Sequence, residues 1–246
     1  MSTALCCVVL YPLLFDPPVG AVPEVKPFPA GLNDCYAGLR FCFDNRADLG
    51  FTEDILVSGE SGGGNLAIAT VMKAKRAGEL HLCRSGLFAL CPYIAGAWPV
   101  GVKDDGRLGT SHIDNARDGE GGGRGSGGGV PELGAAIGYG LEQYEEKNPL
   151  AWPAFASLDD LRGLPRTVIS VNEGDVYRDE GVIFYRKLCA AGVTAECRTV
   201  MGTPHAADVN LWSTIPETVM TTVKMVASFA TNGRPVSPMP HVLPPC

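Results

Sequence analysis

The sequence predicts an α/β fold, with a mostly parallel sheet that is covered by helices on both faces. Short apolar, β-branched runs alternate along the chain with helical segments, and this alternation is typical of parallel strands joined by helical crossovers. The 246 residues are 46% apolar and 19% charged, which is ordinary for a globular protein with a sizeable core. We therefore expect one domain over residues 1–246.

The first half of the chain is expected to supply three strands and two helices. Leu32, Tyr36 and Leu39 follow one another at helical spacing, whereas the runs predicted as strands are short and continuously apolar. In chain order these elements are a buried strand at about Leu5–Leu14, a helix at about Ala30–Asn45, a strand at Asp54–Ser58, a helix at Gly64–Arg76 and a strand at Ser85–Tyr93.

The second half is expected to add two strands and two helices. They are a strand at Pro165–Val171, a helix at about Asp179–Ala191, a strand at Ala195–Val200 and a helix at Glu217–Ala230. Gly192 follows the first of these helices and is a typical helix stop. The segment 235–246 contains five prolines and is predicted to be a loose tail.

Residues 95–148 interrupt the alternation. Gly119–Gly129 is a low-complexity glycine run, and Val130–Glu146 is expected to be helical. An excursion between two strands of a sheet is a suitable place for a cap over an active site. A surface insertion is the alternative for the glycine run, and we favour a cap for the helix after it.

The pentapeptide Gly59-Glu60-Ser61-Gly62-Gly63 lies between a predicted strand and a predicted helix. A G-x-S-x-G sequence in that context is the nucleophile elbow, which exposes the serine hydroxyl above the sheet edge. Glycines are expected to flank Ser61 because side chains there would collide with the neighbouring strand and helix. The N–H groups of Gly62 and Gly63 at the start of the helix are candidate donors to an oxyanion. A glycine-rich turn without catalytic function is the alternative.

A serine nucleophile needs a base, and that base needs an orienting acid. His205 follows the last predicted strand, at the same edge of the sheet as the elbow. Of the other histidines, His81 follows the elbow helix and would lie at the opposite end of the sheet, His112 lies in the glycine-rich excursion, and His241 lies in the proline-rich tail. Asp175 follows an earlier strand at this edge, with Glu173, Asp179 and Glu180 as rivals.

Four segments together resemble the hormone-sensitive-lipase-like branch of α/β-hydrolase esterases. They are Phe28–Cys35, Gly59–Ala67 around the elbow, Asn172–Gly181 and Gly202–Ala206. The resemblance covers about residues 25 to 230 and implies an α/β-hydrolase fold with the triad Ser61, Asp175 and His205. It also implies hydrolysis of short- to medium-chain carboxylic esters without a cofactor or metal. Amide and lactone hydrolysis by the same residues stay open.

The chain departs from this family in one respect. No His-Gly-Gly-Gly stretch, which supplies most of the family's oxyanion hole, precedes the elbow. We therefore expect an N-terminally incomplete sheet, and three explanations stay open: a truncated product, a homodimer formed through the exposed sheet edge, or a different oxyanion donor. A catalytically impaired or small-molecule-binding relative is the alternative function, although receptors of this family lose the base that His205 provides here.

The charge, hydropathy and cysteine spacing of the chain limit the classes of molecule that it is expected to bind. A net charge of −7 without a dense basic run argues against nucleic acid, and no apolar run reaches membrane-spanning length. Nine scattered cysteines without C-x-x-C spacing argue against a zinc ribbon and favour a reducing, cytoplasmic setting. The expected partner is a small-molecule ester. Tyr139, Tyr144, Trp152 and Phe155 are expected either to line its acyl pocket or to belong to the core.

Overall fold

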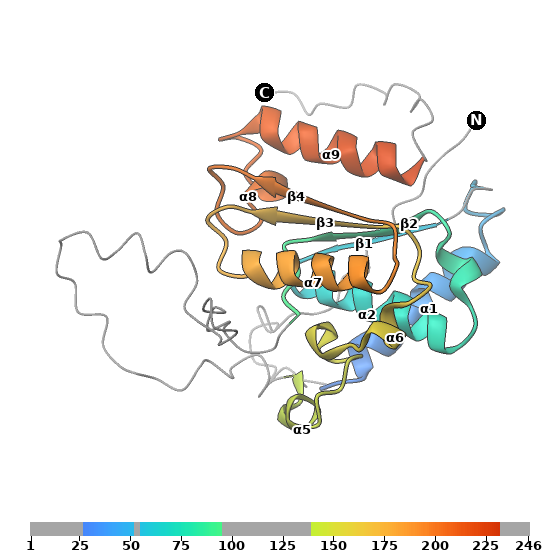
Figure 1. Cartoon of the computed structure of the whole chain (residues 1–246). Coiled ribbons are helices and arrows are strands. Elements are labelled where there is room, and N and C mark those ends of the chain that lie inside the picture. Colours follow the sequence, from blue (N-terminus) through green and yellow to red (C-terminus); the bar gives the residue numbers. More distant parts are fainter. Residues whose placement is uncertain (1–26, 52–54, 95–138, 232–246) are drawn as a thin grey trace, which may run out of the picture.

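The structure, a computed structural model, describes residues 27–51, 55–94 and 139–231 (Figure 1). Its strands are β1 (Leu56–Glu60), β2 (Gly86–Leu90), β3 (Thr167–Asn172) and β4 (Ala195–Val200). Its α-helices are α1 (Ala30–Asp44), α2 (Gly62–Arg76), α5 (Leu141–Glu145), α6 (Leu158–Leu161), α7 (Arg178–Ala190), α8 (Ala207–Asn210) and α9 (Pro216–Ala230). Two 3₁₀ turns, Leu80–Cys83 and Pro153–Phe155, complete the described elements.

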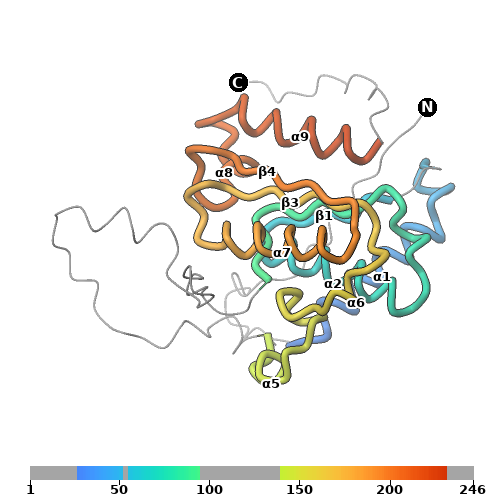
Figure 2. Tube along the Cα trace, viewed as in Figure 1, coloured from blue at the N-terminus to red at the C-terminus, as the bar shows by residue number. Residues whose placement is uncertain are grey.

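The described strands form a single sheet in the order β1-β2-β3-β4, and each neighbouring pair is parallel. Helix α9 covers one face of this sheet, whereas α2 and α7 cover the other, as Figures 1 and 2 show. This layering confirms the α/β prediction. The carboxyl ends of all four strands meet at one edge of the sheet, which is where loops in such folds carry functional residues.

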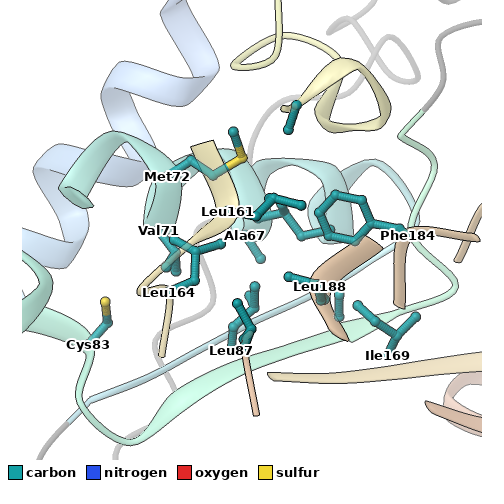
Figure 3. Close-up of a cluster of buried hydrophobic side chains, with 14 of the residues drawn as sticks. Ala67, Val71, Met72, Cys83, Leu87, Leu161, Leu164, Ile169, Phe184 and Leu188 are labelled. Atoms are coloured by element: carbon teal, nitrogen blue, oxygen red, sulfur yellow. The ribbon is translucent and has the colours of Figure 1, made fainter. Parts of the chain in front are cut away.

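Successive strand residues supply the two cores. Leu87 and Ile169 point to the face where α2 and α7 pack, and Figure 3 shows them facing Phe184 and Leu188 of α7. Their neighbours Phe88 and Val168 point to the opposite face and pack under α8 and α9. Because side chains alternate along a strand, β2 and β3 are buried on both faces. β2 is accordingly apolar throughout, whereas β3 also buries the polar residues Thr167, Ser170 and Asn172.

The predicted elements within the described residues are confirmed, with shifted ends. β4 has the predicted bounds, and α7 is followed by Gly192 at φ +77°. α2 begins two residues earlier than predicted, immediately after Ser61. β2 is shorter than predicted and ends at Leu90, because Pro92 lacks the N–H that would continue its ladder.

Helix α1 buries Leu32, Leu39 and Cys42, which follow its inner face. Phe41, although it is apolar, is 60% exposed on the other side of this helix.

Several predictions fall outside the described residues. They are the strand at Leu5–Leu14, the glycine run, most of the helix at Val130–Glu146 and the tail at 235–246. In the described last part of that predicted helix, Tyr139 is helical, Gly140 at φ +133° interrupts the helix, and the short helix α5 follows. The prediction of one continuous helix is therefore wrong at Gly140. In the described ranges no helix is long and apolar enough to cross a membrane.

Candidate active site

Ser61 stands at the sharp turn between β1 and α2. Its backbone lies at φ 55° and ψ −119°, a strained conformation of the kind found at nucleophile elbows. Two hydrogen bonds hold it there: Ser61 N–H donates to the Leu90 carbonyl at 2.9 Å, and the Ser61 carbonyl accepts from Tyr93 N–H at 3.1 Å. The segment after β2 therefore fixes the turn from both sides.

The glycines of the elbow differ in what they make room for. A Cβ on Gly59 would lie 2.0 Å from the Gly63 carbonyl oxygen, and one on Gly64 would lie 3.0 Å from Pro92 Cα. By contrast, a Cβ on Gly62 or Gly63 would meet no heavy atom within 4 Å. The expectation that both glycines flanking Ser61 avoid a collision is thus right for Gly59 and wrong for Gly63, whose own position is open.

The loops that carry Asp175 and His205 are tied to each other. Gly174 N–H donates to the Thr203 carbonyl at 2.9 Å, and Gly202 N–H donates to Glu173 Oε2 at 2.7 Å. These bonds extend the pairing of β3 with β4 past the ends of both strands. As a result, the acid and the histidine are held as one unit at the sheet edge.

The structure brings the three predicted residues together in one hydrogen-bonded chain. Ser61 Oγ lies 2.9 Å from His205 Nε2, and His205 Nδ1 lies 2.8 Å from Asp175 Oδ2. The Asp175 side chain is fully buried, and its Oδ1 accepts from Tyr177 N–H at 2.9 Å. A buried carboxylate on Nδ1 selects the ring tautomer whose Nε2 can accept the serine proton.

The rival acids point elsewhere. Glu173 accepts from Gly202 N–H, and Asp179 pairs with Arg178 at 2.8 Å. Glu180 is buried and accepts from Ile94 N–H at 2.9 Å. None of these contacts reaches the imidazole, which leaves Asp175 as its partner among the four predicted candidates.

Of the other histidines, His81 lies in the 3₁₀ turn before β2 and packs edge-on against Phe43, with ring centroids 5.3 Å apart. It is therefore at the opposite end of the strands from Ser61. His112 and His241 lie outside the described residues.

Glu60 is a neighbour of the histidine that the motif did not single out. Its Oε1 lies 3.3 Å from His205 Nε2. The pKa of His205 is raised to about 9, mainly by its hydrogen bond to Asp175 and next by Glu60. The sequence offered one signal for this contact: Glu60 precedes Ser61 at the end of a predicted strand, which brings its side chain to the same edge of the sheet as the histidine loop.

A buried polar network lies behind the histidine loop. Asn172 Nδ2 donates to Thr203 Oγ1 at 2.6 Å and to Asp208 Oδ1 at 3.0 Å. Asp208 also pairs with Arg198 at 3.1 Å and accepts from Thr222 Oγ1 at 2.8 Å. This network joins β3, β4, α8 and α9 beneath the loop, and the sequence offered no pattern that marks it.

Cys91 lies at the end of β2, next to Asp175 and His205. Ligand atoms of these three residues lie within 4.8 Å of one another. However, Asp175 and His205 direct those atoms at each other, and the Cys91 thiol donates to Asn172 Oδ1. Burial raises the pKa of that thiol, which keeps it protonated, so we assign no metal ligands here.

Asn65, four residues after Ser61, has a structural task. Its buried side-chain amide donates to the carbonyls of Tyr93 at 3.1 Å and Ala151 at 3.0 Å. It therefore joins the elbow helix to the segments that follow β2 and α5.

The aromatic residues near the site form one packed cluster. Trp152 is 2% exposed and meets Tyr139 and Tyr144 edge-on, while Tyr144 meets Phe155. Tyr93 packs on Trp152 and on Tyr177, whose ring stands edge-on to His205. The four predicted aromatic residues thus belong to a core that borders the site. Whether they also contact an acyl group stays a prediction.

Comparison with known proteins gives one consistent result. A family model described as alpha/beta hydrolase fold matches residues 22–208. An arylesterase from Saccharolobus solfataricus is 30% identical over 190 residues, which cover 75% of this chain and 54% of that protein.

Solved structures extend the similarity. The esterase Est22 superposes with a TM-score of 0.72 at 42% identity, covering 86% of this chain and 57% of its own. A brefeldin A esterase, described as a bacterial homologue of human hormone-sensitive lipase, superposes with a TM-score of 0.66 at 38% identity, covering 85% and 55%. The chain spans about half the length of the curated relatives it matches.

Proposed function

This chain belongs to the α/β-hydrolase family, and on that premise we propose that it is a serine carboxylester hydrolase for short- to medium-chain esters. Ser61 acts as nucleophile, His205 as general base and acid, and Asp175 as the group that orients and stabilises the imidazole. The observation that carries the proposal is the Ser61–His205–Asp175 hydrogen-bond chain, with distances of 2.9 and 2.8 Å. The esterases among its relatives support the reaction class.

In the acylation step Ser61 Oγ attacks the ester carbonyl carbon while its proton passes to His205 Nε2. The carbonyl π electrons move to the oxygen and form a tetrahedral oxyanion. Collapse of this intermediate breaks the bond to the alcohol oxygen, which takes the proton from Nε2. Water then attacks the acyl-enzyme by the same route and releases the acid.

The oxyanion needs hydrogen-bond donors that are already in place. Gly62 and Gly63 are the first residues of α2, and the N–H groups of a first helical turn have no partner within the helix. The positive end of the helix dipole lies at the same point. The open space around both glycines supports an approach of substrate from this side.

Hydrolysis of p-nitrophenyl butyrate by the chain and by Ser61→Ala tests the proposal. We expect the wild-type activity to disappear in the variant, and a series from p-nitrophenyl acetate to palmitate to favour the shorter esters. A fluorophosphonate probe should label Ser61 in the wild type only. A folded chain that neither hydrolyses the esters nor takes the label would instead favour the non-catalytic, ligand-binding alternative.

Two further expectations belong to this proposal. A homodimer could form through a sheet edge, because among the described strands β1 and β4 each pair on one side only; light scattering measures the mass in solution. A reducing, cytoplasmic setting is supported by Cys83, Cys91, Cys189 and Cys197, none of which is in a disulfide.

A further inference from the structure

The side chain of Glu60 ends beside the imidazole nitrogen that receives the serine proton. Its Oε1 lies 3.3 Å from His205 Nε2, and both side chains are 32% exposed. The oxygen itself is buried and accepts no hydrogen bond from any described group. Burying a carboxylate oxygen without a hydrogen-bond donor costs folding free energy. Its position at this nitrogen is therefore explained best by a role in the chemistry of the imidazole.

The protonation state of the ring decides whether this contact is favourable. When Nδ1 carries the proton and donates to Asp175, Nε2 presents a lone pair, and the Glu60 oxygen faces it without a donor between them. When Nε2 gains a proton, the same oxygen faces an N–H on a positive ring. The contact therefore favours the imidazolium over the neutral imidazole.

We propose that Glu60 is a further catalytic residue, a second carboxylate that stabilises the His205 imidazolium as Ser61 attacks. The inference rests on the proposed function and deepens it. As the Oγ–carbon bond forms, the serine proton moves to Nε2 and the carbonyl electron pair moves to oxygen. Glu60 takes no proton in this step; it attracts the charge that appears on the ring. Such an interaction is stronger in the transition state than in the neutral ground state, which is the condition for catalysis.

Other groups around the ring set the background for this effect. Asp175 accepts from Nδ1 on the side of β3, and Cys91 at the end of β2 stays a neutral thiol. The Tyr177 ring stands edge-on to the imidazole at the start of α7. Glu60 is thus the second acidic contributor, after Asp175, to the raised pKa of His205.

A neutral replacement at position 60 has a pH-specific consequence. At low pH the free enzyme already carries the imidazolium, so Glu60 stabilises the free enzyme and the transition state equally, and its loss changes kcat/KM little. At high pH the free enzyme carries neutral imidazole, so only the transition state is stabilised. We expect Glu60→Gln to lower the pKa of His205 by about one unit and to lower the alkaline plateau of kcat/KM by about tenfold.

The experiment measures kcat/KM for p-nitrophenyl butyrate from pH 6 to 10 in wild type, Glu60→Gln and Glu196→Gln. Glu196 is exposed on the edge strand β4, so its variant removes one charge without touching the imidazole and should follow the wild-type curve. The proposal predicts that the Glu60→Gln curve merges with the wild-type curve at acid pH and falls below it at alkaline pH. An equal loss at every pH, or no loss at any, would overturn it.

A second measurement does not depend on turnover. The ring signals of ¹³C-labelled histidine are titrated by NMR, and His205→Gln identifies the His205 signal. A lower His205 pKa in Glu60→Gln supports the proposed contact even if no ester is hydrolysed, whereas an unchanged value refutes it. If Glu60→Gln does not fold, Glu60→Asp should produce a smaller shift in the same direction, because its shorter side chain moves the carboxylate away from Nε2.

Discussion

Replacing Gly59 by alanine tests the packing on which the elbow depends. The new Cβ would lie 2.0 Å from the Gly63 carbonyl oxygen and 2.4 Å from its carbon, both of them backbone atoms. The two groups would have to separate by about 1 Å to reach even the shortest distance that real Cβ atoms show. Because Gly63 belongs to the first turn of α2, this separation moves the helix start relative to β1.

The magnitude follows from that displacement. Overpacking of this kind typically costs about 1–3 kcal/mol of unfolding free energy, which corresponds to a fall in Tm of roughly 2–12 °C for a chain of this size. A shift of about 1 Å at Ser61, which lies between the two groups, is enough to lower kcat about a hundredfold.

Gly63→Ala is the matched control for stability. Its Cβ meets no heavy atom within 4 Å, so the substitution should leave Tm unchanged or raise it slightly, as alanine does for a helical position. Differential scanning fluorimetry gives Tm for both variants, and p-nitrophenyl butyrate gives kcat for Gly59→Ala. If Gly59→Ala kept the wild-type Tm and kcat, the close approach of β1 to α2 would not determine the stability of the elbow or the position of Ser61.

Three further predictions follow from the described contacts. Because the folded pKa of His205 is about 9 against an unfolded value near 6.5, its stabilising effect is complete below pH 6.5 and is lost as pH rises toward 9. Because the side chain is 32% exposed and solvent screens its ion pairs, the expected contribution is about 1–2 kcal/mol. In urea titrations the free energy of unfolding of wild type should fall by that amount over this pH range, and that of His205→Gln should not. Asp175→Asn should lower kcat about ten-thousandfold by favouring the wrong ring tautomer, with Tm as the check that the chain still folds. Phe184→Ala in the core should cost about 3–5 kcal/mol in urea unfolding, whereas Ile183→Ala on the exposed side of the same helix should cost far less.

The sequence was sufficient where a local pattern determines the outcome. The continuous apolar run of β2 and the glycine after α7 are visible without any tertiary information. The preference for Asp175 over Glu173 as the partner of His205 depends only on where β3 ends. That strand stops at Asn172, so Glu173 turns to the Gly202 amide, while Asp175 reaches the imidazole two residues later.

The sequence was insufficient where contacts depend on how separate strands meet. The approach of Glu60 to His205 joins the end of β1 to the loop that follows β4, and no spacing in the sequence places these two side chains together. Helix α8 has four residues, too few for an amphipathic pattern, and it is held by the buried Asp208 network instead. Gly63 was misjudged for the opposite reason. The motif suggested that a side chain at this position would collide, but the close backbone contacts are at Gly59 and Gly64.

The hydrogen bonds between the Asp175 loop and the His205 loop make these two loops one structural unit, and Ser61 belongs to another. Asp175 and His205 are held together beyond the ends of β3 and β4, whereas Ser61 follows β1 and is hydrogen-bonded to Leu90 at the end of β2. The β2–β3 ladder is therefore the joint between them. A fluctuation that opens this ladder would separate Ser61 from His205 while leaving the Asp175–His205 pair intact, so the Ser61–His205 hydrogen bond would be lost before the His205–Asp175 one.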